Sequence, residues 1–272
     1  LTEIAETLLR KVLELAWADL LPKFGRPRCA VDGAEREAGF AVVAYGKLGG
    51  IELNYGSDLD LVFLHDSAGD RQFTDGPRPI DNPSFFAKLV QRIIHLLTAR
   101  TGAGDLYEVD TRLRPSGRAG LLVSSFEAFA EYQRHQAWTW EHQALTRTRV
   151  VAGPPELAER YRLFRREILS VGRDPEALRR EVREMRERMR AELDASTAET
   201  FDLKQGRGGI ADIEFMVQYK VLANANRYPD LLAYTDNIRQ LDGLERFGIL
   251  SIADAARLRN AYRGLRRRIH LD

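Results

Sequence analysis

The sequence has little cysteine, almost no net charge and no long apolar run. Its one cysteine, Cys29, among 272 residues excludes an internal disulfide bond and any metal site built from several cysteines. The net charge of +1 gives the chain no overall attraction to nucleic acid or to a membrane surface. No apolar run is long enough to span a bilayer, and the first residues are amphipathic and acidic, unlike a signal peptide. We therefore expect a cytoplasmic protein that binds neither membranes nor nucleic acid.

Start and stop signals are also missing. The first residue is Leu1 rather than methionine, and the last residues continue a helical pattern without a glycine or proline to end it. We therefore expect the chain to be a fragment of a larger protein. The basic run at 257–268 lies at this end, where we expect the missing continuation to supply its partners, so we do not interpret the run as a nucleic-acid site.

The order of patterns predicts an α+β domain followed by helices. A broad apolar stripe predicts a leading helix over 1–25, and two prolines and two glycines in 22–35 are typical of a linker. Strands are predicted at 40–46, 59–65 and 106–115, and a helix is predicted at 81–102 with Asn82 as its N-cap. Beyond residue 150 the patterns are helical. We expect a catalytic domain at 26–152 and a helical bundle at 153–272.

Carboxylates gather on two of the predicted strands. Asp58 and Asp60 are two residues apart at the start of an apolar strand, so their side chains should lie on one face. Asp110 lies on the polar face of the next predicted strand, with Arg112 and Arg114 beyond it. Close carboxylates repel each other unless a cation lies between them, and oxygen ligands favour Mg²⁺ or Mn²⁺. The three aspartates therefore predict a divalent metal site beside arginines that suit phosphate, the pairing that nucleotidyl transfer requires.

A glycine turn precedes the two aspartates. Gly49 and Gly50 follow the first strand, where exposed backbone amides could approach phosphate oxygens, and Lys47 adds a positive charge. Ser57, directly before the first aspartate, joins this set of expected nucleotide ligands. The spacing matches neither GxxxxGK[ST] nor GxGxxG, which disfavours a P-loop or a dinucleotide-binding fold.

Each motif also has an ordinary structural interpretation. A lone DxD is more often a turn or a solvated strand end than a metal site, and exposed arginines usually pair with surface acids. The histidines show no metal-ligand spacing with one another or with Cys29, so we expect them to pack or to lie at the surface. The coincidence of glycine pair, DxD and a third aspartate with arginines, in this order, favours a two-metal nucleotidyl-transfer site.

Four blocks of sequence resemble the glutamine synthetase adenylyltransferases, within the nucleotidyltransferase superfamily. They are "GKLGGIELNYGSDLDLVFLHD", "LYEVDTRLRPSGRAGLLV", "AWTWEHQALTRTRVVAG" and "GRGGIADIEFMVQY". That family is a large bifunctional enzyme with two related catalytic domains, one attaching AMP to glutamine synthetase and one removing it. The residue types at several positions are similar to those of the AMP-attaching domain, namely Tyr45, Leu59, His65, Tyr107, Ser116 and the segment 138–145. The resemblance implies a nucleotidyltransferase-fold mixed sheet with flanking helices.

The resemblance also implies a reaction. Mg²⁺ and ATP would bind at Asp58, Asp60 and Asp110, a tyrosine of glutamine synthetase would attack the α-phosphorus, and pyrophosphate would leave. Asp110 would be the base, and Lys47, Arg112 and Arg114 would balance the triphosphate charge. Glutamine and the PII signalling protein would regulate the full-length enzyme in nitrogen metabolism. Two alternatives stay open, namely phosphorolytic removal of AMP and a non-catalytic nucleotide-binding module.

The last block has a role that the residues alone leave open. Gly208 and Gly209 precede Asp212 and Glu214, with Lys204 nearby, in a pattern that opens a helix. Acids are favoured at a helix N-terminus by the helix dipole, so the block could be a plain helix start. The resemblance favours a contribution of these five residues to nucleotide or acceptor positioning.

Overall fold

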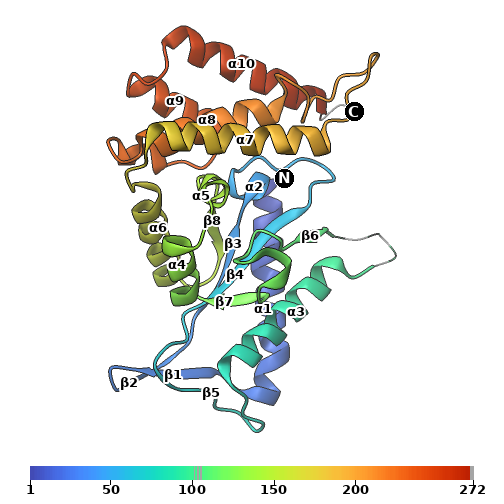
Figure 1. The fold of residues 1–272 in the computed structure, drawn as a ribbon. Coiled ribbons are helices and arrows are strands. Elements are labelled where there is room, and N and C mark those ends of the chain that lie inside the picture. The colour runs from blue at the N-terminus through green and yellow to red at the C-terminus, as the bar shows by residue number, and fades with distance from the viewer. Residues whose placement is uncertain (101, 103, 105, 270–272) are drawn as a thin grey trace. The chain divides into compact units, whose positions relative to one another are not determined.

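The computed structural model describes residues 1–100, 102, 104 and 106–269 (Figure 1). Its elements are α1 (Thr2–Phe24), β1 (Pro27–Val31), β2 (Ala34–Glu37), β3 (Phe40–Ala44), α2 (Gly46–Gly49), β4 (Leu59–His65), β5 (Asp70–Thr74), α3 (Asn82–Thr98), β6 (Val109–Asp110), η1 (Gly117–Ala119), β7 (Val123–Ser125), α4 (Phe126–His135), α5 (Thr139–Leu145), β8 (Arg149–Ala152), α6 (Pro155–Leu169), α7 (Pro175–Leu193), α8 (Ile210–Asn224), η2 (Pro229–Leu232), α9 (Asn237–Arg246) and α10 (Ile252–Ile269). The predicted α+β class, with helices in the C-terminal part, is confirmed.

The chain divides into two compact units. Unit 1 comprises Leu1–Ala137 with Thr148–Phe164, and unit 2 comprises Trp138–Arg147 with Arg165–Asp272. Unit 1 holds the sheets, whereas the elements of unit 2 are helical. The domain boundaries that the sequence suggests, at 25 and 152, stay predictions.

The main sheet of unit 1 is mixed. Its strand order is β6-β4-β3-β8, with β3 antiparallel to β4 and β8, and both β6 and β7 run parallel to β4. Strand β4 is buried along almost its whole length because it is central and has neighbours on both edges. The register that matters most is the pairing of β4 with β6, which sets Asp60 opposite Asp110.

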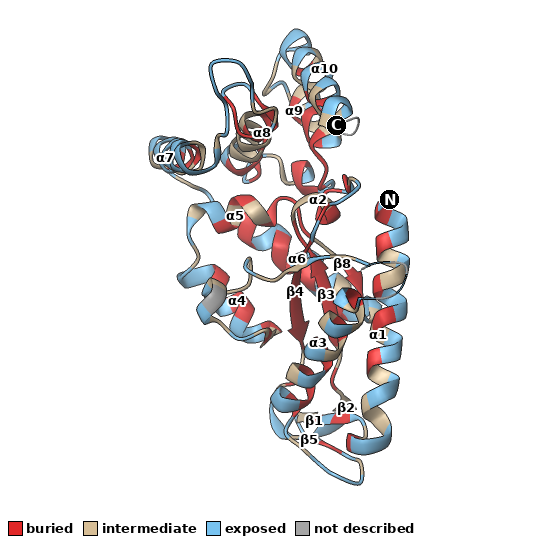
Figure 2. Ribbon diagram, turned by 90° about the vertical axis from the view of Figure 1, so that its right-hand side faces the viewer, coloured by how far each residue is buried: buried red, intermediate tan, exposed pale blue. Residues whose placement is uncertain are grey.

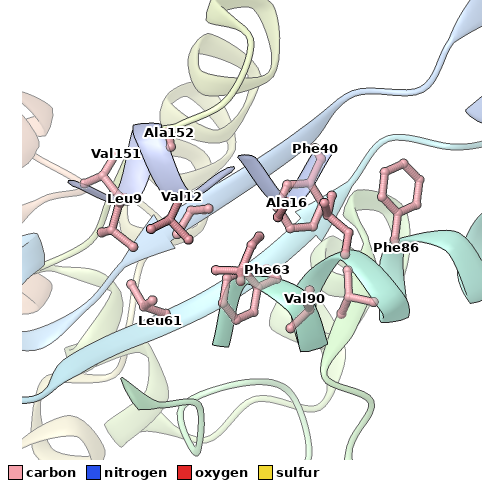
Figure 3. Packing of buried hydrophobic residues seen from close by; sticks show 14 of the residues in the cluster. Leu9, Val12, Ala16, Phe40, Leu61, Phe63, Phe86, Val90, Val151 and Ala152 are labelled. Atoms are coloured by element: carbon pink, nitrogen blue, oxygen red, sulfur yellow. The ribbon is translucent and has the colours of Figure 1, made fainter. Parts of the chain in front are cut away.

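Two helices cover one face of this sheet. Leu9 and Val12 of α1 and Phe86 and Val90 of α3 pack with Phe63 of β4 in one hydrophobic cluster (Figure 3). The buried residues of α1 recur every three or four positions and include Ala5 and Ala16, as the red stripe along this helix shows (Figure 2). Small residues at these positions let α1 approach α3 closely. Ile4, which the sequence stripe placed on the buried face, is 57% exposed.

The predicted linker over 22–35 is wrong, because this segment forms a hairpin. Strands β1 and β2 are antiparallel, with Val31 opposite Ala34 and a two-residue turn at Asp32 and Gly33. Both turn residues have positive φ, 51° and 79°, as a type I′ hairpin turn requires. An Asp-Gly pair is the usual signal for this turn, so the sequence does carry the information.

The N-cap of α3 also differs from the prediction. Asp81, not Asn82, caps the helix, since its carboxylate accepts a hydrogen bond from the Ser84 amide at 2.8 Å. Asn82 is fully buried instead, and its amide group donates to the backbone oxygen of Arg28 and to Ser67 Oγ. Asp81 therefore caps the helix, whereas Asn82 links the helix to strand β1 of the hairpin.

Unit 2 is a set of packed helices. Helix α8 contacts α5, α7, α9 and α10, so it is central to the unit. Its buried residues include Ile213, Val217 and Val221, which share one face. Within the described part of the chain, no helix combines the length and apolar character that crossing a membrane would demand.

Candidate active site

The three aspartates of the sequence prediction come together at one edge of the main sheet. Asp58 directly precedes β4, Asp60 lies within it, and parallel pairing of β6 places Asp110 beside Asp60. One carboxylate oxygen from each aspartate lies within 4.8 Å of those of the other two. Extended backbone sends residues 58 and 60 to the same side, and the register supplies the third acid.

The donor set suits a hard cation. Asp58 is exposed, while Asp60 and Asp110 are half-buried, and the three offer only oxygen atoms. Asp58 and Asp110 line an open hollow of about 480 Å³, together with Glu108, Val109, Thr111, Arg112 and Arg114. Carboxylates this close repel each other, and a divalent ion of the Mg²⁺ or Mn²⁺ type relieves that repulsion. The residues present therefore fit a divalent metal.

Arg112 pairs with one of these acids. Its backbone amide donates to Asp110 Oδ1 at 2.8 Å, and its guanidinium donates to Asp110 Oδ2 through Nε at 2.7 Å and through Nη2. The hydrogen bond that Arg112 donates to Asp110 raises the pKa of Arg112, and the charges of Asp110, Asp58 and Asp60 add to the effect. The Arg112 side chain is 61% exposed, so it can leave Asp110 without disturbing the core.

Arg114 braces its own loop. Its guanidinium donates to the backbone oxygen of Thr111 at 2.7 Å and to that of Gly120 at 3.1 Å. The strand predicted over 106–115 is therefore mostly wrong, because only Val109–Asp110 is strand and a turn follows. The alternation that suggested a strand reflects charged residues that bind loop backbone and a neighbouring acid.

The glycine turn is a short helix, α2, rather than an open loop. The Gly49 amide donates to the Tyr45 oxygen at 2.8 Å, and the Gly50 amide donates to the Gly46 oxygen at 3.0 Å. These two amides are thus engaged within the turn, which differs from the exposed amides that we expected. Lys47 Nζ donates to Ser57 Oγ at 3.2 Å, so these two expected nucleotide ligands lie together.

Gly46 is a site residue that the sequence reasoning missed. Its φ is +54°, and a Cβ at this position would lie 2.2 Å from Asp60 Oδ2. Any other residue would therefore collide with the carboxylate of the site, in a backbone conformation that favours glycine. The signal was the glycine that ends the predicted strand 40–46, but the interpretation considered only the Gly49-Gly50 pair.

The second acidic block lies in unit 2, where its first acid binds arginines. Gly209 is the N-cap of α8, and Asp212 lies in the first turn of the helix. Its carboxylate accepts from Arg186 at 2.6 Å, from Arg190 at 2.7 Å and from the Gly208 amide at 2.7 Å. Burial alone would raise the pKa of Asp212, but the Gly208 amide and the two arginines together lower it.

Glu214 joins a different polar network of unit 2. It forms an ion pair with Arg147 at 2.5 Å and accepts from Tyr262 Oη at 3.2 Å, and Asn237 donates to the same hydroxyl at 2.8 Å. Lys204 is exposed. Asp212 and Glu214 thus tie helices together inside this unit, and the role of the block in a reaction stays a prediction.

His65 is a packing residue, at the far end of β4 from the acids. It is 5% exposed, and its ring stacks on Phe86 with 4.6 Å between centroids. Burial lowers its pKa from 6.5 to about 4, because the charged form would lose its hydration. His65 is therefore neutral near pH 7.

The chain is similar to proteins of one enzyme family. A family model described as glutamate-ammonia ligase adenylyltransferase matches residues 1–164, and one described as GlnD PII-uridylyltransferase matches residues 176–271. A bifunctional glutamine synthetase adenylyltransferase/adenylyl-removing enzyme of Thioalkalivibrio sulfidiphilus is 58% identical over 270 residues, 99% of this chain and 28% of that protein. A protein of the same name from Nitrosococcus oceani is 54% identical over 266 residues, with 98% and 28% covered. This chain therefore spans a little over a quarter of these relatives, and it belongs to the glutamate-ammonia ligase adenylyltransferase family.

Proposed function

We propose that the chain transfers AMP from ATP to a tyrosine of glutamine synthetase. The observation that carries this proposal is the convergence of Asp58, Asp60 and Asp110 within 4.8 Å at the edge of a mixed sheet. Membership of the family, and the names of relatives at 58% and 54% identity, support the choice of acceptor. The region 26–152 would be the catalytic domain, with the helices of 153–272 as a bundle domain.

In this proposal the three aspartates hold Mg²⁺, or Mn²⁺ in its place. A divalent ion at such a site neutralises phosphate charge and lowers the pKa of a bound hydroxyl. Lys47 and Ser57, which already share a hydrogen bond, bind the phosphates, and Gly49 and Gly50 form the turn that holds Lys47. Arg112 lies at the hollow and balances the triphosphate, while Arg114 shapes the loop that presents Arg112.

The reaction needs a proton acceptor. The tyrosine oxygen forms a bond to the α-phosphorus, the bond from that phosphorus to the bridging oxygen breaks, and pyrophosphate leaves with the electron pair. A tyrosine hydroxyl has an unperturbed pKa of about 10, so its proton must be taken up near pH 7. We assign that role to Asp110, whose carboxylate is released for it when Arg112 turns to the phosphates.

The second block would help to position nucleotide or acceptor. Asp212 and Glu214 fix the start of α8 through their arginines, and exposed Lys204 and Gly208 border that start. In this proposal Gly209 is the N-cap at which α8 begins. These residues would affect binding by setting the position of α8.

Removal of AMP by phosphate is the second candidate, because the relatives' names include an adenylyl-removing activity. The wording at Tyr45, Leu59 and His65 favours attachment for this chain. The products separate the two reactions, since attachment releases pyrophosphate and phosphorolysis of the modified enzyme releases ADP.

We further propose that the whole protein acts in the cytoplasm in nitrogen metabolism, under control of PII and glutamine. The match of residues 176–271 to a PII-uridylyltransferase model supports a link to PII signalling. The test is binding of purified PII, with and without glutamine, to the full-length protein and to this chain. A full-length protein that ignores both would contradict the proposal.

The test of the main proposal is direct. The chain is incubated with glutamine synthetase, ATP and Mg²⁺, and the acceptor is analysed by peptide mass spectrometry. We expect one AMP on a tyrosine, release of pyrophosphate, and loss of both with Asp58→Asn. A folded wild-type chain that yields no modified tyrosine would contradict attachment, and ADP formed from modified glutamine synthetase and phosphate would favour removal.

A further inference from the structure

Arg149, at the start of β8, binds the end of the glycine turn. Its Nε donates to the backbone oxygen of Gly49 at 3.1 Å, and its Nη2 donates to that of Leu48 at 3.0 Å. The last carbonyls of a helix have no partner inside it, and a guanidinium is well suited to bind two of them. β8 pairs with β3, with Arg149 opposite Ala44, so the side chain starts from a fixed strand.

Glu6 of α1 holds this guanidinium in place. The Glu6 carboxylate forms ion pairs with Arg149 and, at 3.1 Å, with Arg10. The side chains of Glu6 and Arg149 are only 14% and 24% exposed, so solvent screens this pair less than a surface pair. Arg149 therefore pairs with Glu6 of α1 while it donates hydrogen bonds to the glycine turn.

The other end of the turn lies against the acid site. Gly46 begins α2, and the space of its missing Cβ is taken by Asp60 Oδ2. Tyr45 donates its amide to the backbone oxygen of Asp60 at 2.9 Å, and Lys47 within α2 reaches Ser57. A shift of α2 would therefore move Lys47 and change the space beside Asp60.

We infer that Arg149, oriented by Glu6, is a positioning residue that sets the glycine turn for nucleotide binding. It acts through the carbonyls of Leu48 and Gly49. This inference rests on the proposed function, since it assigns the turn to the nucleotide. Neither Arg149 nor Glu6 is among the residues that the sequence patterns singled out.

A simpler role for Arg149 would be to fasten α1 to β8. Arg10 gives a matched control for that role, because it also pairs with Glu6 and donates from Nε to the backbone oxygen of Val151 on β8 at 3.3 Å. Among the described residues, the Arg10 side chain donates to Glu6 and Val151 and not to α2. If fastening is the whole role, Arg149→Met and Arg10→Met should behave alike.

The first measurement does not depend on ATP. Hydrogen exchange of peptides that cover 46–53 reports the stability of the turn, since the Gly49 and Gly50 amides close it. We expect Arg149→Met to speed this exchange by about tenfold, as loss of one or two hydrogen bonds predicts, and Arg10→Met to leave it unchanged. Equal exchange in the two variants would overturn the inference.

The second measurement is MgATP binding by calorimetry, with steady-state AMP transfer beside it. We expect Arg149→Met to weaken ATP binding and raise KM for ATP by about tenfold, with a smaller loss of kcat. Arg149→Lys should recover part of the affinity, and Glu6→Gln should show a smaller loss of the same kind. Arg10→Met should bind ATP as the wild type does.

The outcomes separate the positioning role of Arg149 from the proposed AMP transfer. ATP affinity that is unchanged in Arg149→Met, or lowered equally in Arg10→Met, would overturn the positioning role while the wild type still transfers AMP. A wild type that binds no ATP would contradict the proposed function, and the exchange measurement would still decide whether Arg149 fixes the turn. If Arg149→Met does not fold, Arg149→Lys and Glu6→Gln carry the same comparison.

Discussion

The chain contains two glycine pairs that are followed by acids two residues apart, and the units use them differently. In unit 1, extended backbone sends Asp58 and Asp60 to one side, where Asp110 joins them. In unit 2, Asp212 and Glu214 lie in a helix, where residues two apart point about 200° from each other. The first pair therefore converges on one point, and the second pair divides between two sets of partners.

The partners follow the same division. In unit 1, Asp110 pairs with the exposed Arg112, and Asp58 and Asp110 line an open hollow. The unit 2 acids bind Arg186, Arg190 and Arg147, whose side chains are 7%, 14% and 4% exposed. Carboxylates that pair with buried guanidinium groups are neutralised and fixed, whereas clustered carboxylates beside an exposed arginine offer oxygen ligands to a metal. Secondary structure thus decides which acidic pair converges on one point, where a metal ion could bind.

The largest expected effect comes from removing one acid of the cluster. Asp60→Asn should lower AMP transfer about a thousandfold, because a lost metal ligand removes several kcal/mol of transition-state stabilisation. Thermal stability should not fall, since the change removes like-charge repulsion. Rates from the mass-spectrometric assay and melting temperatures check both statements. Asp212→Asn is the matched control, and it should leave Mn²⁺ binding to the three aspartates of unit 1 unchanged. Weaker Mn²⁺ binding in Asp212→Asn would contradict the contrast between the acids of the two units.

Acid should destabilise the two units in different pH ranges. Burial holds the pKa of His65 at about 4 against 6.5 in an unfolded chain, so the unfolded state binds more protons between these values. Unit 1 should lose up to about 3 kcal/mol as the pH falls from 6.5 to 4. The pKa of Asp212 lies below 3.8, so its contribution is present above pH 3.8 and is lost as the pH falls through the lowered pKa.

Hydrogen exchange of β4 and α8 peptides over a pH series, corrected for intrinsic rates, separates these losses. His65→Gln should remove most of the loss in β4 and leave α8 unchanged. Parallel losses in both peptides, starting at the same pH, would contradict the assignment.

Removing Asp212, the acid that pairs with two arginines, should lower the stability of unit 2 by less than the acid-induced loss expected for unit 1. Asp212→Asn leaves Arg186 nearly buried without its carboxylate, and we expect a loss of about 2 kcal/mol in the free energy of urea unfolding. Arg186→Met in the same background should cost less than it does alone, because the pair acts as a unit. Additive costs in this cycle would show that Asp212 does not depend on Arg186 and would weaken the contrast between the units.

Part of the site could be predicted because side chains alternate between the two faces of a strand with a period of two residues. The placement of Asp58 and Asp60 on one side follows from local extended backbone, and adjacent strands bring Asp110 near them. The helical C-terminal part also follows from local patterns, whereas the mixed sheet was an implication of the family resemblance. The common side of Asp58 and Asp60 and the C-terminal helices need no knowledge of long-range contacts, whereas the position of Asp110 depends on the pairing of β4 with β6.

The remainder depends on contacts that local patterns do not contain. Alternation over 106–115 is no proof of a strand, because Arg114 binds loop oxygens that only the folded turn supplies. The need for glycine at 46 comes from a carboxylate fourteen residues later, and Arg149 reaches the turn from a hundred residues away. The missed hairpin at 27–37 is different, since its Asp32-Gly33 signal was local and was overlooked.

The smallest expected effect tests whether Arg112 and a metal compete for Asp110. Arg112→Gln should strengthen Mn²⁺ binding without nucleotide severalfold, because the Arg112 guanidinium is removed from Asp110, and it should weaken ATP binding because a phosphate partner is lost. Arg114→Gln is the matched control, because the Arg114 guanidinium donates to Thr111 and Gly120 of its own loop, and it should change Mn²⁺ affinity less than Arg112→Gln does. Calorimetric titration with Mn²⁺ measures both. Weaker Mn²⁺ binding in Arg112→Gln would mean that Arg112 orients Asp110 for the metal, and the acids of unit 1 would then be as firmly tied as those of unit 2.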